Sequence, residues 1–510
     1  MSLHRYIAGG VLIAALASAC QTDRPTAPET EQPALKLGKT GKRLPPKSGG
    51  VEVPFRRGSV GRGANSGQQK GNGKGAWTSV GPNVVTNQDH TFLPQNEPAI
   101  AVDPDHPNRL IASSNDYRFA LESDSKCGAY ASTDGGKSWH DVGNGTMPLP
   151  LIAGSDPSVA FAPNGDAYWA CVAFERQTFA SALVVAKSSN LTSITTLSPL
   201  TSTPNGFEVF NDKPYMTIDR GQRSPFRGSI YVTWTHFDAT GAPIYVSSSS
   251  TGGATWTAPH PVTPPDLPDN QGSFPGVGPD GELYVAYENY DTPTLNVNQI
   301  MVSKSTDGGA SFSRPVKVDA VFDICPRIVF GSCSLLNSSF RVNSFPSLAV
   351  DQHTGRVFVT WGDYRTGNAD VLAASSPDGS RWRWPVRVND DPGNADQFFP
   401  AVAVTPSGAV SIAYYDRRND PANFLIDTYV STAGGGGLNF HKSARATSDA
   451  FDPDSDASFG GAFLGDYIGN AASRQAAHPI WTDTRPLGFP APNQDAVTAT
   501  VFLNQELAHH

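Results

Sequence analysis

The chain has 510 residues, with 38 lysines and arginines against 47 aspartates and glutamates, and therefore a net charge of −9. This length allows one large domain or several smaller ones, and the acidic balance argues against a nucleic-acid partner, which needs a basic surface. Only five cysteines are present, and none lies in the Cys-x-x-Cys spacing that is typical of a metal site.

The first twenty residues have the pattern of an export signal. Arg5 precedes an apolar run from residue 7 to residue 19, which is too short to cross a bilayer. The run ends in Leu-Ala-Ser-Ala directly before Cys20, and this resembles the lipidation site of bacterial lipoproteins. We therefore expect a protein that is held at the cell envelope by a lipid on Cys20, with an ordinary signal peptide and a secreted protein as the alternative. No other stretch is apolar enough to span a membrane, so the lipid would be its one membrane contact.

Residues 21–76 predict a disordered tether. They are rich in Pro, Gly, Lys and Gln, and such a composition buries too little apolar surface to fold. The tether carries eleven lysines and arginines against four aspartates and glutamates, whereas residues 77–510 carry 26 against 43. The basic charge is thus confined to the tether, and the domain that follows is strongly acidic.

One sequence pattern recurs six times within residues 77–510. It consists of a small or acidic residue, a proline, an apolar strand, a glycine turn and a second apolar strand that ends in an aromatic residue. Its prolines are Pro98, Pro157, Pro214, Pro275, Pro346 and Pro400, which lie 59, 57, 61, 71 and 54 residues apart. The longest step contains Cys325 and Cys333, which indicates an insertion.

A second motif follows this pattern at a steady distance. Residues 132–139 and 305–312 are complete copies of Ser-x-Asp-x-Gly-x-x-aromatic, and residues 249–256 keep the frame without the aspartate. The aspartate can accept backbone hydrogen bonds within a turn, and the glycine can take a positive φ. The motif therefore predicts a structural hairpin and no catalysis.

These motifs resemble the Asp boxes, or BNR repeats, of the sialidase superfamily, and the resemblance covers nearly all of residues 77–510. It implies an all-β propeller of four-stranded antiparallel blades. Six units are explicit, and a seventh needs the strands near residues 465, 478 and 494 together with residues 77–85 from the other end of the domain. We predict seven blades closed by strands from both termini, with six blades as the alternative. A closed ring has no free edge that demands a partner, so we expect a monomer.

The resemblance also places a ligand site on the face opposite the Asp boxes, where each second strand ends and each first strand begins. Second-strand ends carry an acid-x-Arg pattern, and first-strand starts add further acids. A sialidase-like site needs arginines for a substrate carboxylate, an aspartate as acid/base, and a tyrosine nucleophile activated by a glutamate. The corresponding predictions are Arg118, Arg365, Arg418 and Arg485 for substrate binding; Asp363 and Asp416 for acid/base chemistry; Tyr415 and Tyr467 as nucleophiles, with Glu288 as their partner; and Glu97, Asp156, Asp212 and Asp396 as first-strand acids.

A structural role for the acid-x-Arg pairs is the alternative. A catalytic residue need occur once, whereas this pattern occurs in four of seven units, which favours pairing between adjacent blades. The Phe/Tyr-Arg-Ile-Pro signature of sialidases is also absent.

Two further features concern disulfides and metal. We expect disulfides between Cys325 and Cys333 and between Cys127 and Cys171, although two other connectivities of these four cysteines are open. Asp452, Asp454 and Asp456 stand at alternate positions and could hold Ca²⁺ through their oxygen atoms, with a solvated acidic loop as the alternative. No other cofactor is expected.

Three functions fit these observations. The first is an extracytoplasmic, sialidase-like glycoside hydrolase that acts on acidic glycans or polysaccharides. The second is a surface lipoprotein that binds glycan or protein without catalysis. The third is a lyase of uronic-acid polymers, for which His236, Tyr467 and Arg485 are the candidate residues.

Overall fold

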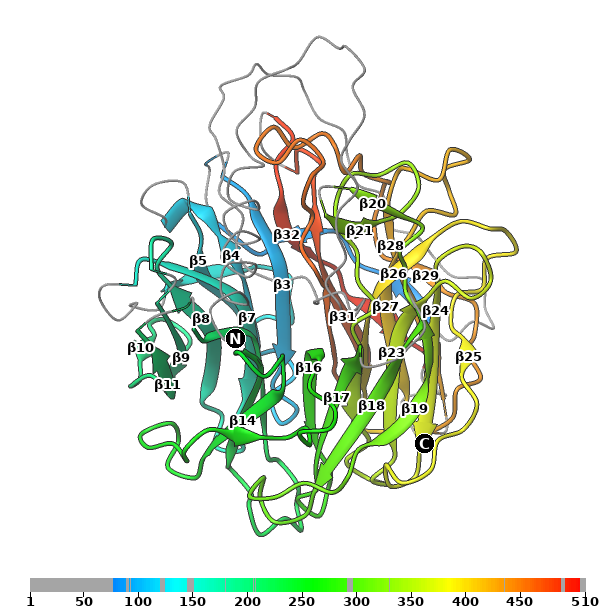
Figure 1. Ribbon diagram of the computed structural model, residues 1–510. Coiled ribbons are helices and arrows are strands. Elements are labelled where there is room, and N and C mark those ends of the chain that lie inside the picture. Colours follow the sequence, from blue (N-terminus) through cyan, green and yellow to red (C-terminus); the bar gives the residue numbers. More distant parts are fainter. Residues whose placement is uncertain are drawn as a thin grey trace, which may run out of the picture.

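A computed structural model describes residues 77–504, apart from 89–90, 92, 120–123, 145–150, 179, 205, 207, 291–296, 330, 435 and 488–490. The described residues form seven antiparallel sheets arranged as the blades of a propeller, together with a separate two-stranded hairpin (Figure 1). This confirms the prediction of an all-β propeller with seven blades. Cys20 and the expected signal and tether lie outside the described residues.

The first three blades follow the repeat in chain order. Blade 1 consists of β3 (Gln95–Val102), β4 (Leu110–Asp116), β5 (Lys126–Ser132) and β6 (His140–Asn144), with a short 3-10 turn, η1 (Tyr117–Phe119), after β4. Blade 2 consists of β7 (Ala153–Phe161), β8 (Ala167–Phe174), β9 (Ser181–Ser188), β10 (Thr195–Thr196) and β11 (Thr201–Thr203). Blade 3 consists of β12 (Phe210–Ile218), β13 (Ile230–Phe237), β14 (Ile244–Ser249) and β15 (His260–Pro261).

The next three blades have the same order of strands. Blade 4 consists of β16 (Asn270–Val277), β17 (Leu283–Asn289), β18 (Val297–Ser305) and β19 (Val316–Phe322). Blade 5 consists of β22 (Ser347–Val350), β23 (Val357–Asp363), β24 (Asp370–Ser376) and β25 (Val386–Arg387). Blade 6 consists of β26 (Gln397–Val404), β27 (Val410–Asp416), β28 (Asp427–Ala433) and β29 (Ala444–Arg445).

Blade 7 closes the ring with strands from both ends of the domain, as expected. Its later strands are β30 (Gly469–Ala472), β31 (Ala476–Asp483), β32 (Asp495–Thr498) and β33 (Val501–Leu503). The outer edge comes from β1 (Trp77–Val80), which pairs with β33, and β2 (Val84–Val85), which pairs with β32. This pairing occupies sheet edges that would otherwise be open.

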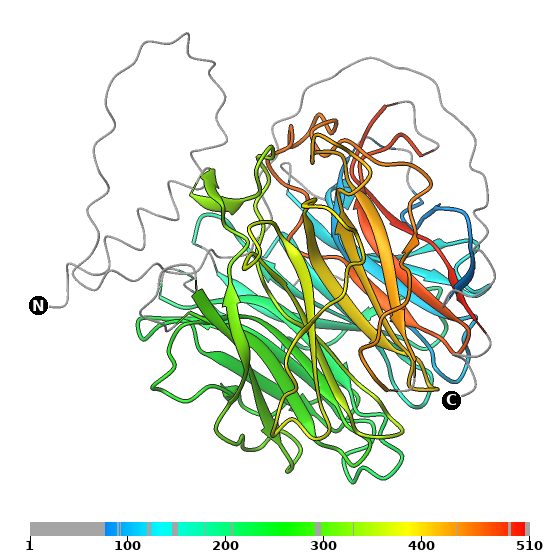
Figure 2. The same cartoon turned by 90° about the vertical axis from the view of Figure 1, so that its right-hand side faces the viewer.

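The insertion between β19 and β22 stands apart from the blades. It contains the hairpin of β20 (Arg327–Val329) and β21 (Ser332–Ser334) and the disulfide Cys325–Cys333. In Figures 1 and 2 the hairpin lies at the upper end of the molecule, where the orange segment that leads into β30 also lies. The insertion therefore adds residues to the end at which second strands finish and first strands begin.

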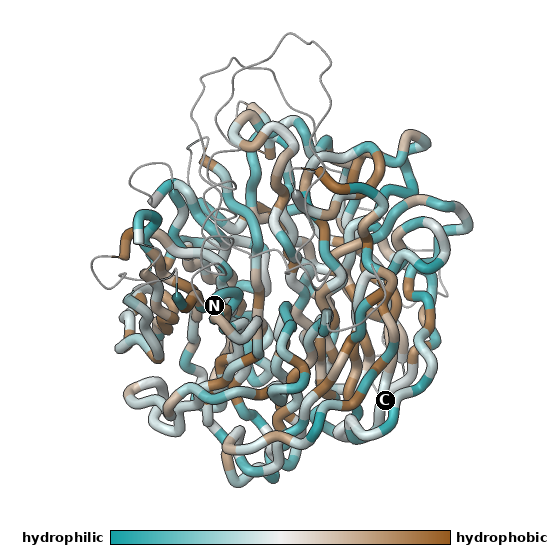
Figure 3. Tube along the Cα trace, viewed as in Figure 1, coloured by the Kyte–Doolittle hydropathy of each residue, from teal (hydrophilic) through white to brown (hydrophobic). Residues whose placement is uncertain are grey.

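The core lies between the blades, since each blade packs its two faces against its neighbours. The second strands are almost wholly buried, and Trp234, Trp361 and Trp481 on three of them have no exposed surface. Figure 3 shows hydrophobic residues concentrated along the strands and hydrophilic residues in the connecting turns. No helix of the described residues has the length and apolar character that a membrane span requires.

The two complete copies of the turn motif have one geometry. Asp134 accepts hydrogen bonds from the backbone N–H groups of Lys137 and Ser138, both at 3.0 Å. Asp307 likewise accepts the N–H of Ser311 at 3.0 Å, and its hydrogen bonds lower its pKa to about 2. These aspartates serve the hairpin turns, so their carboxylates are occupied within the turn.

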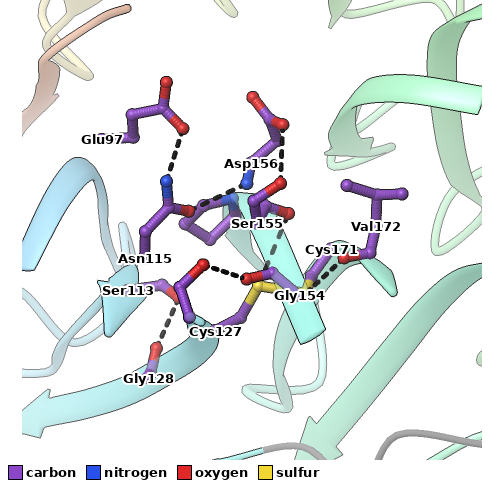
Figure 4. The surroundings of a disulfide bond; sticks show 12 residues. Glu97, Ser113, Asn115, Cys127, Gly128, Gly154, Ser155, Asp156, Cys171 and Val172 are labelled. Carbon is purple, nitrogen blue, oxygen red and sulfur yellow. Dashed lines mark hydrogen bonds between the residues drawn. A yellow bond between two sulfur atoms is a disulfide. The ribbon is translucent and has the colours of Figure 1, made fainter. Parts of the chain in front are cut away.

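Both expected disulfides are present. Cys127 on β5 and Cys171 on β8 join blades 1 and 2, and Cys325 and Cys333 close the base of the insertion (Figure 4 shows the first). Disulfides persist in oxidising compartments, so this pairing agrees with an extracytoplasmic protein.

Candidate active site

The first strand of several blades starts with a strained bulge. At Glu97, Asp156, Lys213 and Phe399 the backbone has a φ of 53°, 54°, 51° and 50°, and each of these residues precedes a proline. The pairing register with the second strand shifts at each of these points. A positive φ in a non-glycine residue costs about 1–2 kcal/mol, so these bulges are maintained by the surrounding structure. Such bulges re-aim side chains and are frequent beside active sites.

Two of the bulge residues are acids that share one asparagine (Figure 4). Asn115, at the end of β4, donates from Nδ2 to Oε2 of Glu97 at 2.7 Å, and its Oδ1 accepts the backbone N–H of Asp156 at 3.0 Å. Glu97 also accepts the backbone N–H of Asp466 at 3.1 Å. Oδ2 of Asp156 accepts from Ser155, while its buried Oδ1 has no hydrogen-bond partner in the described part of the chain. One carboxylate oxygen at the centre of this cluster is thus left for another group.

Two cations complete what we call the axial cluster: Glu97, Asp156, Lys213, Arg341 and Asp466. Arg341, from the insertion, binds Asp466 through Nε at 2.6 Å and through Nη2 at 2.7 Å. Lys213 lies with Nζ 3.5 Å from the centre of the Tyr467 ring, which is a cation–π contact. Residues from three blades and from the insertion therefore meet here.

Burial sets the protonation of the axial cluster. Glu97 and Asp156 are at most 1% exposed. Burial raises the pKa of Glu97 well above its ordinary value, and the nearby Asp156 and Asp466 raise it further, against the opposing effect of Lys213 and Arg341. Burial also raises the pKa of Asp156 and lowers that of Lys213. A carboxyl group that keeps its proton at higher pH than usual can act as a general acid.

A second group of polar side chains lies in blade 4, where β17 and β19 end and β18 begins. Tyr290 donates from its hydroxyl to Oε2 of Glu288 at 3.1 Å, and Asn298 donates to Oε1 of Glu288 at 3.1 Å and to Oδ2 of Asp323 at 2.6 Å. Burial and the nearby Asp323 raise the pKa of Glu288 well above its ordinary value, against the opposing effect of its hydrogen bond with Asn298. Burial raises the pKa of Tyr290 well above its ordinary value, and the charges of Glu288, Asp323 and Asp466 raise it further.

The structure brings together some of the predicted residues in a different way. Glu288 has a tyrosine partner, but this is Tyr290 and neither of the two tyrosines that the sequence favoured. Tyr467 lies beside the axial cluster, where its ring contacts Lys213 and its hydroxyl donates to the carbonyl of Pro157 at 3.4 Å. Tyr415 is fully buried and exchanges hydrogen bonds with the backbone of Thr482 at 2.9 and 3.0 Å. Tyr415 therefore joins blade 6 to blade 7, and its hydroxyl is occupied by the backbone of Thr482.

The four predicted arginines do not form one cluster. Each binds the aspartate two positions before it: Arg118 binds Asp116 at 2.9 Å, Arg365 binds Asp363 at 2.7 Å, Arg418 binds Asp416 at 2.7 Å and Arg485 binds Asp483 at 2.6 Å. Each aspartate is at most 1% exposed. Each guanidinium is already paired with a buried carboxylate, which favours the structural alternative over convergence on a substrate carboxylate.

The remaining contacts of these arginines support the scaffold alternative. Arg365 reaches Asp319 on the outer strand of blade 4 at 3.0 Å, and Arg418 reaches Asp390 after the outer strand of blade 5. Arg485 donates to Ser448, which follows the outer strand of blade 6, at 2.7 Å. Three of the four acid-x-Arg pairs, which we call the blade corners, therefore connect a blade to the preceding blade.

The three aspartates proposed for Ca²⁺ do not converge. Asp452 accepts the backbone N–H of Asp454 at 2.8 Å, and Asp456 accepts the backbone N–H groups of Ser458 and Phe459 at 3.0 and 3.3 Å. Within the described ranges no group of three or more His, Cys, Asp or Glu residues is placed to hold a metal ion. This segment is an acidic turn, and the calcium prediction is wrong.

Lys213, Arg341 and Asp466 were missed in the sequence. Lys213 stands in the same position before a proline as Glu97 and Asp156, so the alignment of repeats could have found it. Arg341 lies in the insertion that the 71-residue step revealed, on the face where insertions reach a ligand site.

The chain has distant likenesses among solved structures. No family model and no curated protein matches it. Among solved structures, a protein of unknown function from Dyadobacter fermentans is 13% identical, with 83% of this chain and 98% of that chain covered and a TM-score of 0.46. An α-L-arabinofuranosidase from Fusarium graminearum is 11% identical, with 85% and 99% covered and a TM-score of 0.47. A polysaccharide lyase acting on ulvan is 10% identical, with 82% and 96% covered and a TM-score of 0.46. At these identities and scores the likeness concerns the overall course of the chain, and no residue role is transferred.

Proposed function

We propose that the protein is an extracytoplasmic glycoside hydrolase that acts on acidic glycans, with its active site at the end of the propeller where the axial cluster lies. The observation that carries this proposal is the hydrogen-bonded pair of Tyr290 and Glu288, at the same end of the blades as the axial cluster with its buried acids and two cations. Glycoside hydrolysis needs a nucleophile or activated water and a group that protonates the leaving oxygen. Both kinds of group are present on this face.

The roles follow from charge. A neutral tyrosine suits an anionic sugar better than a carboxylate does, because a carboxylate nucleophile would meet the negative charge of the substrate. Glu288 accepts the proton of the Tyr290 hydroxyl as the oxygen attacks the anomeric carbon. Glu97, whose pKa is raised, would donate a proton to the leaving oxygen. Water then releases the sugar, and the two proton transfers reverse.

The cations determine the preference for acidic substrates. Lys213 lies over the face of the Tyr467 ring and near the acids Asp156 and Glu97, and Arg341 binds Asp466. A substrate carboxylate could compete with Asp466 for Arg341, since a guanidinium binds a carboxylate in two-pronged fashion. Glu97 and Asp156 are at most 1% exposed, so substrate entry requires a movement of the residues that cover them.

Mass spectrometry of products tests this function. The purified full chain is incubated with sialylated oligosaccharides, oligogalacturonides and neutral arabino-oligosaccharides in water enriched in ¹⁸O. Incorporation of ¹⁸O at a new reducing end, lost in Tyr290→Phe and Glu97→Gln, is the expected result. Asp219→Asn is the matched control, since Asp219 is a buried carboxyl of raised pKa after the far end of β12.

Other outcomes separate the alternatives. An unsaturated product without added water would indicate elimination and a lyase. Retention of a glycan without any cleavage, with binding lost in Arg341→Gln, would indicate a binding protein. Cleavage that persists in both Tyr290→Phe and Glu97→Gln would exclude the site proposed here.

A further inference from the structure

The outer edge of blade 5 carries an exposed aromatic side chain between arginines. Trp384 is 87% exposed, and Arg381 and Arg383, on either side of the half-buried Trp382, are also exposed. The segment joins the turn after β24 to β25, the outermost strand of the blade at the right of Figure 1. An indole of this size is rarely left in solvent by a folded protein, so the exposure needs an explanation.

The two arginines differ from most others in the domain. The arginines of the blade corners, of the axial cluster and of several turns bind carboxylates. In the described part of the chain, the guanidinium groups of Arg381 and Arg383 make no hydrogen bond or ion pair, while Arg387, four residues beyond Arg383, binds Asp370 and Asp391. In a domain with 43 acids against 26 basic residues, two unpaired arginines beside an exposed tryptophan are a local positive surface.

This surface lies at the end of the blade away from the axial cluster. β23 and β24 pair Asp363 with Asp370 at one end and Val357 with Ser376 at the other. Asp363 corresponds to Asp116, the strand end beside Asn115 and Glu97, so Ser376 and the turn that follows it lie at the opposite end. A ligand bound at Trp384 could not be the sugar that reacts at the axial cluster.

We infer that Arg381, Arg383 and Trp384 form a second binding site, for a chain of an acidic polysaccharide. The flat face of the indole suits the C–H face of a sugar ring, and the two guanidinium groups suit its carboxylates or sulfates. Lys304, whose Nζ donates to the carbonyl of Asp378 at 3.2 Å, also acts on the Asp378 carboxylate, so this acid is offset by a cation beside the two arginines. The site would hold a polymer on the surface independently of cleavage at the axis, and its chemistry does not depend on the proposed hydrolase function.

A bilayer fits this surface less well. A membrane is wide and flat, so it would also meet the acidic surface around these few positive charges, whereas a single polymer chain can lie along the three side chains alone. Insertion into the headgroup region also needs a broad apolar face, whereas here Trp384 is accompanied only by Pro385 and by Val386, which is 37% exposed. Charge complementarity to a soluble polyanion is the stronger match.

Affinity electrophoresis of the full chain tests the site. Native gels contain polygalacturonate, chondroitin sulfate or, as the uncharged control, dextran, and anionic vesicles of phosphatidylcholine and phosphatidylglycerol are used in a separate flotation assay. We expect retardation by at least one acidic polymer and none by dextran. Trp384→Ala and the double variant Arg381→Gln/Arg383→Gln should each weaken binding at least about tenfold.

The controls make every outcome decisive. Arg474→Gln removes one exposed arginine elsewhere and should leave retardation unchanged, and thermal unfolding verifies that each variant is folded. Unchanged retardation in both test variants, absence of binding to either acidic polymer, or binding to the vesicles alone would each overturn the inference. If the axial cluster hydrolyses a short oligosaccharide, Trp384→Ala should retain that activity, so failure of this site and failure of the proposed function are distinguishable.

Discussion

Arg341 and Asp466 are 125 residues apart in the chain, yet they form a two-pronged ion pair with distances of 2.6 and 2.7 Å. Arg341 belongs to the insertion after blade 4, and Asp466 directly precedes blade 7. Asp466 also donates its backbone N–H to Glu97 in blade 1. The pair therefore connects the insertion to the strained start of β3. Arg341 holds Asp466 in place, and the backbone of Asp466 in turn holds the Glu97 carboxylate.

Arg341→Gln should destabilise the protein by about 3–5 kcal/mol, because a buried Asp466 would lose its cation. Chemical denaturation measures the loss. Arg223→Gln, which breaks an exposed pair with Asp280, is the control and should leave the unfolding midpoint unchanged. Equal midpoints for Arg341→Gln and the wild type would show that the ion pair contributes nothing to the fold.

Glu97→Gln should alter how stability depends on pH. Burial raises the pKa of Glu97 in the folded protein above the ordinary value of 4.5, so between these two values the folded state holds a proton that the unfolded state has released. Stability from this group is present below 4.5 and is lost as the pH rises through the folded pKa. Denaturation at a series of pH values should therefore show the wild type losing stability relative to Glu97→Gln above pH 4.5. A constant difference across the series would contradict the raised pKa.

Tyr290→Phe and Tyr415→Phe should have opposite effects. Tyr290→Phe removes the hydroxyl that donates a hydrogen bond to Glu288. The rate of hydrolysis should fall by about two orders of magnitude or more, while the free energy of unfolding falls by about 1 kcal/mol. The second removes two hydrogen bonds to Thr482 in a fully buried position, so stability should fall more and the activity of the folded enzyme should persist. Initial rates and melting curves of both variants give the comparison. Loss of activity in Tyr415→Phe but not in Tyr290→Phe would instead support Tyr415 as the nucleophile.

Arg485→Gln tests whether the acid-x-Arg corners belong to the scaffold. Asp483 has no exposed surface, and loss of its cation should cost about 3 kcal/mol. The KM for an acidic substrate should stay within about twofold, because Arg485 is directed to Asn83, Ser448 and its own aspartate. Arg314→Gln, with an exposed partner in Asp266, is the matched control. A large rise in KM without loss of stability would instead assign Arg485 to the substrate.

The propeller could be predicted from the sequence because the same order of apolar strand, glycine turn, second strand and aromatic residue recurs in each blade. Strands β1 and β2 could be assigned to blade 7 because that unit lacked an outer strand. The same periodicity also indicated the structural role of the acid-x-Arg pairs, because a pattern that recurs at Arg118, Arg365 and Arg485 is typical of the scaffold and not of a single catalytic site. The axial cluster could not be predicted from the repeats alone. Arg341 and Asp466 lie in segments that do not follow the repeat, and these segments meet only when the ring of blades is closed.

The two disulfides should differ in what they stabilise. Cys127 and Cys171 are 44 residues apart and join two blades, so their replacement by serine should cost about 4 kcal/mol by loop entropy, against about 2.5 kcal/mol for the 8-residue separation of Cys325 and Cys333. The shorter loop, however, holds the base of the insertion that carries Arg341. Activity at a temperature where both double variants are folded should therefore fall further in Cys325→Ser/Cys333→Ser than in Cys127→Ser/Cys171→Ser. The reverse order would mean that the contact of blade 1 with blade 2, beneath Glu97 and Asp156, controls the site more strongly than the insertion does.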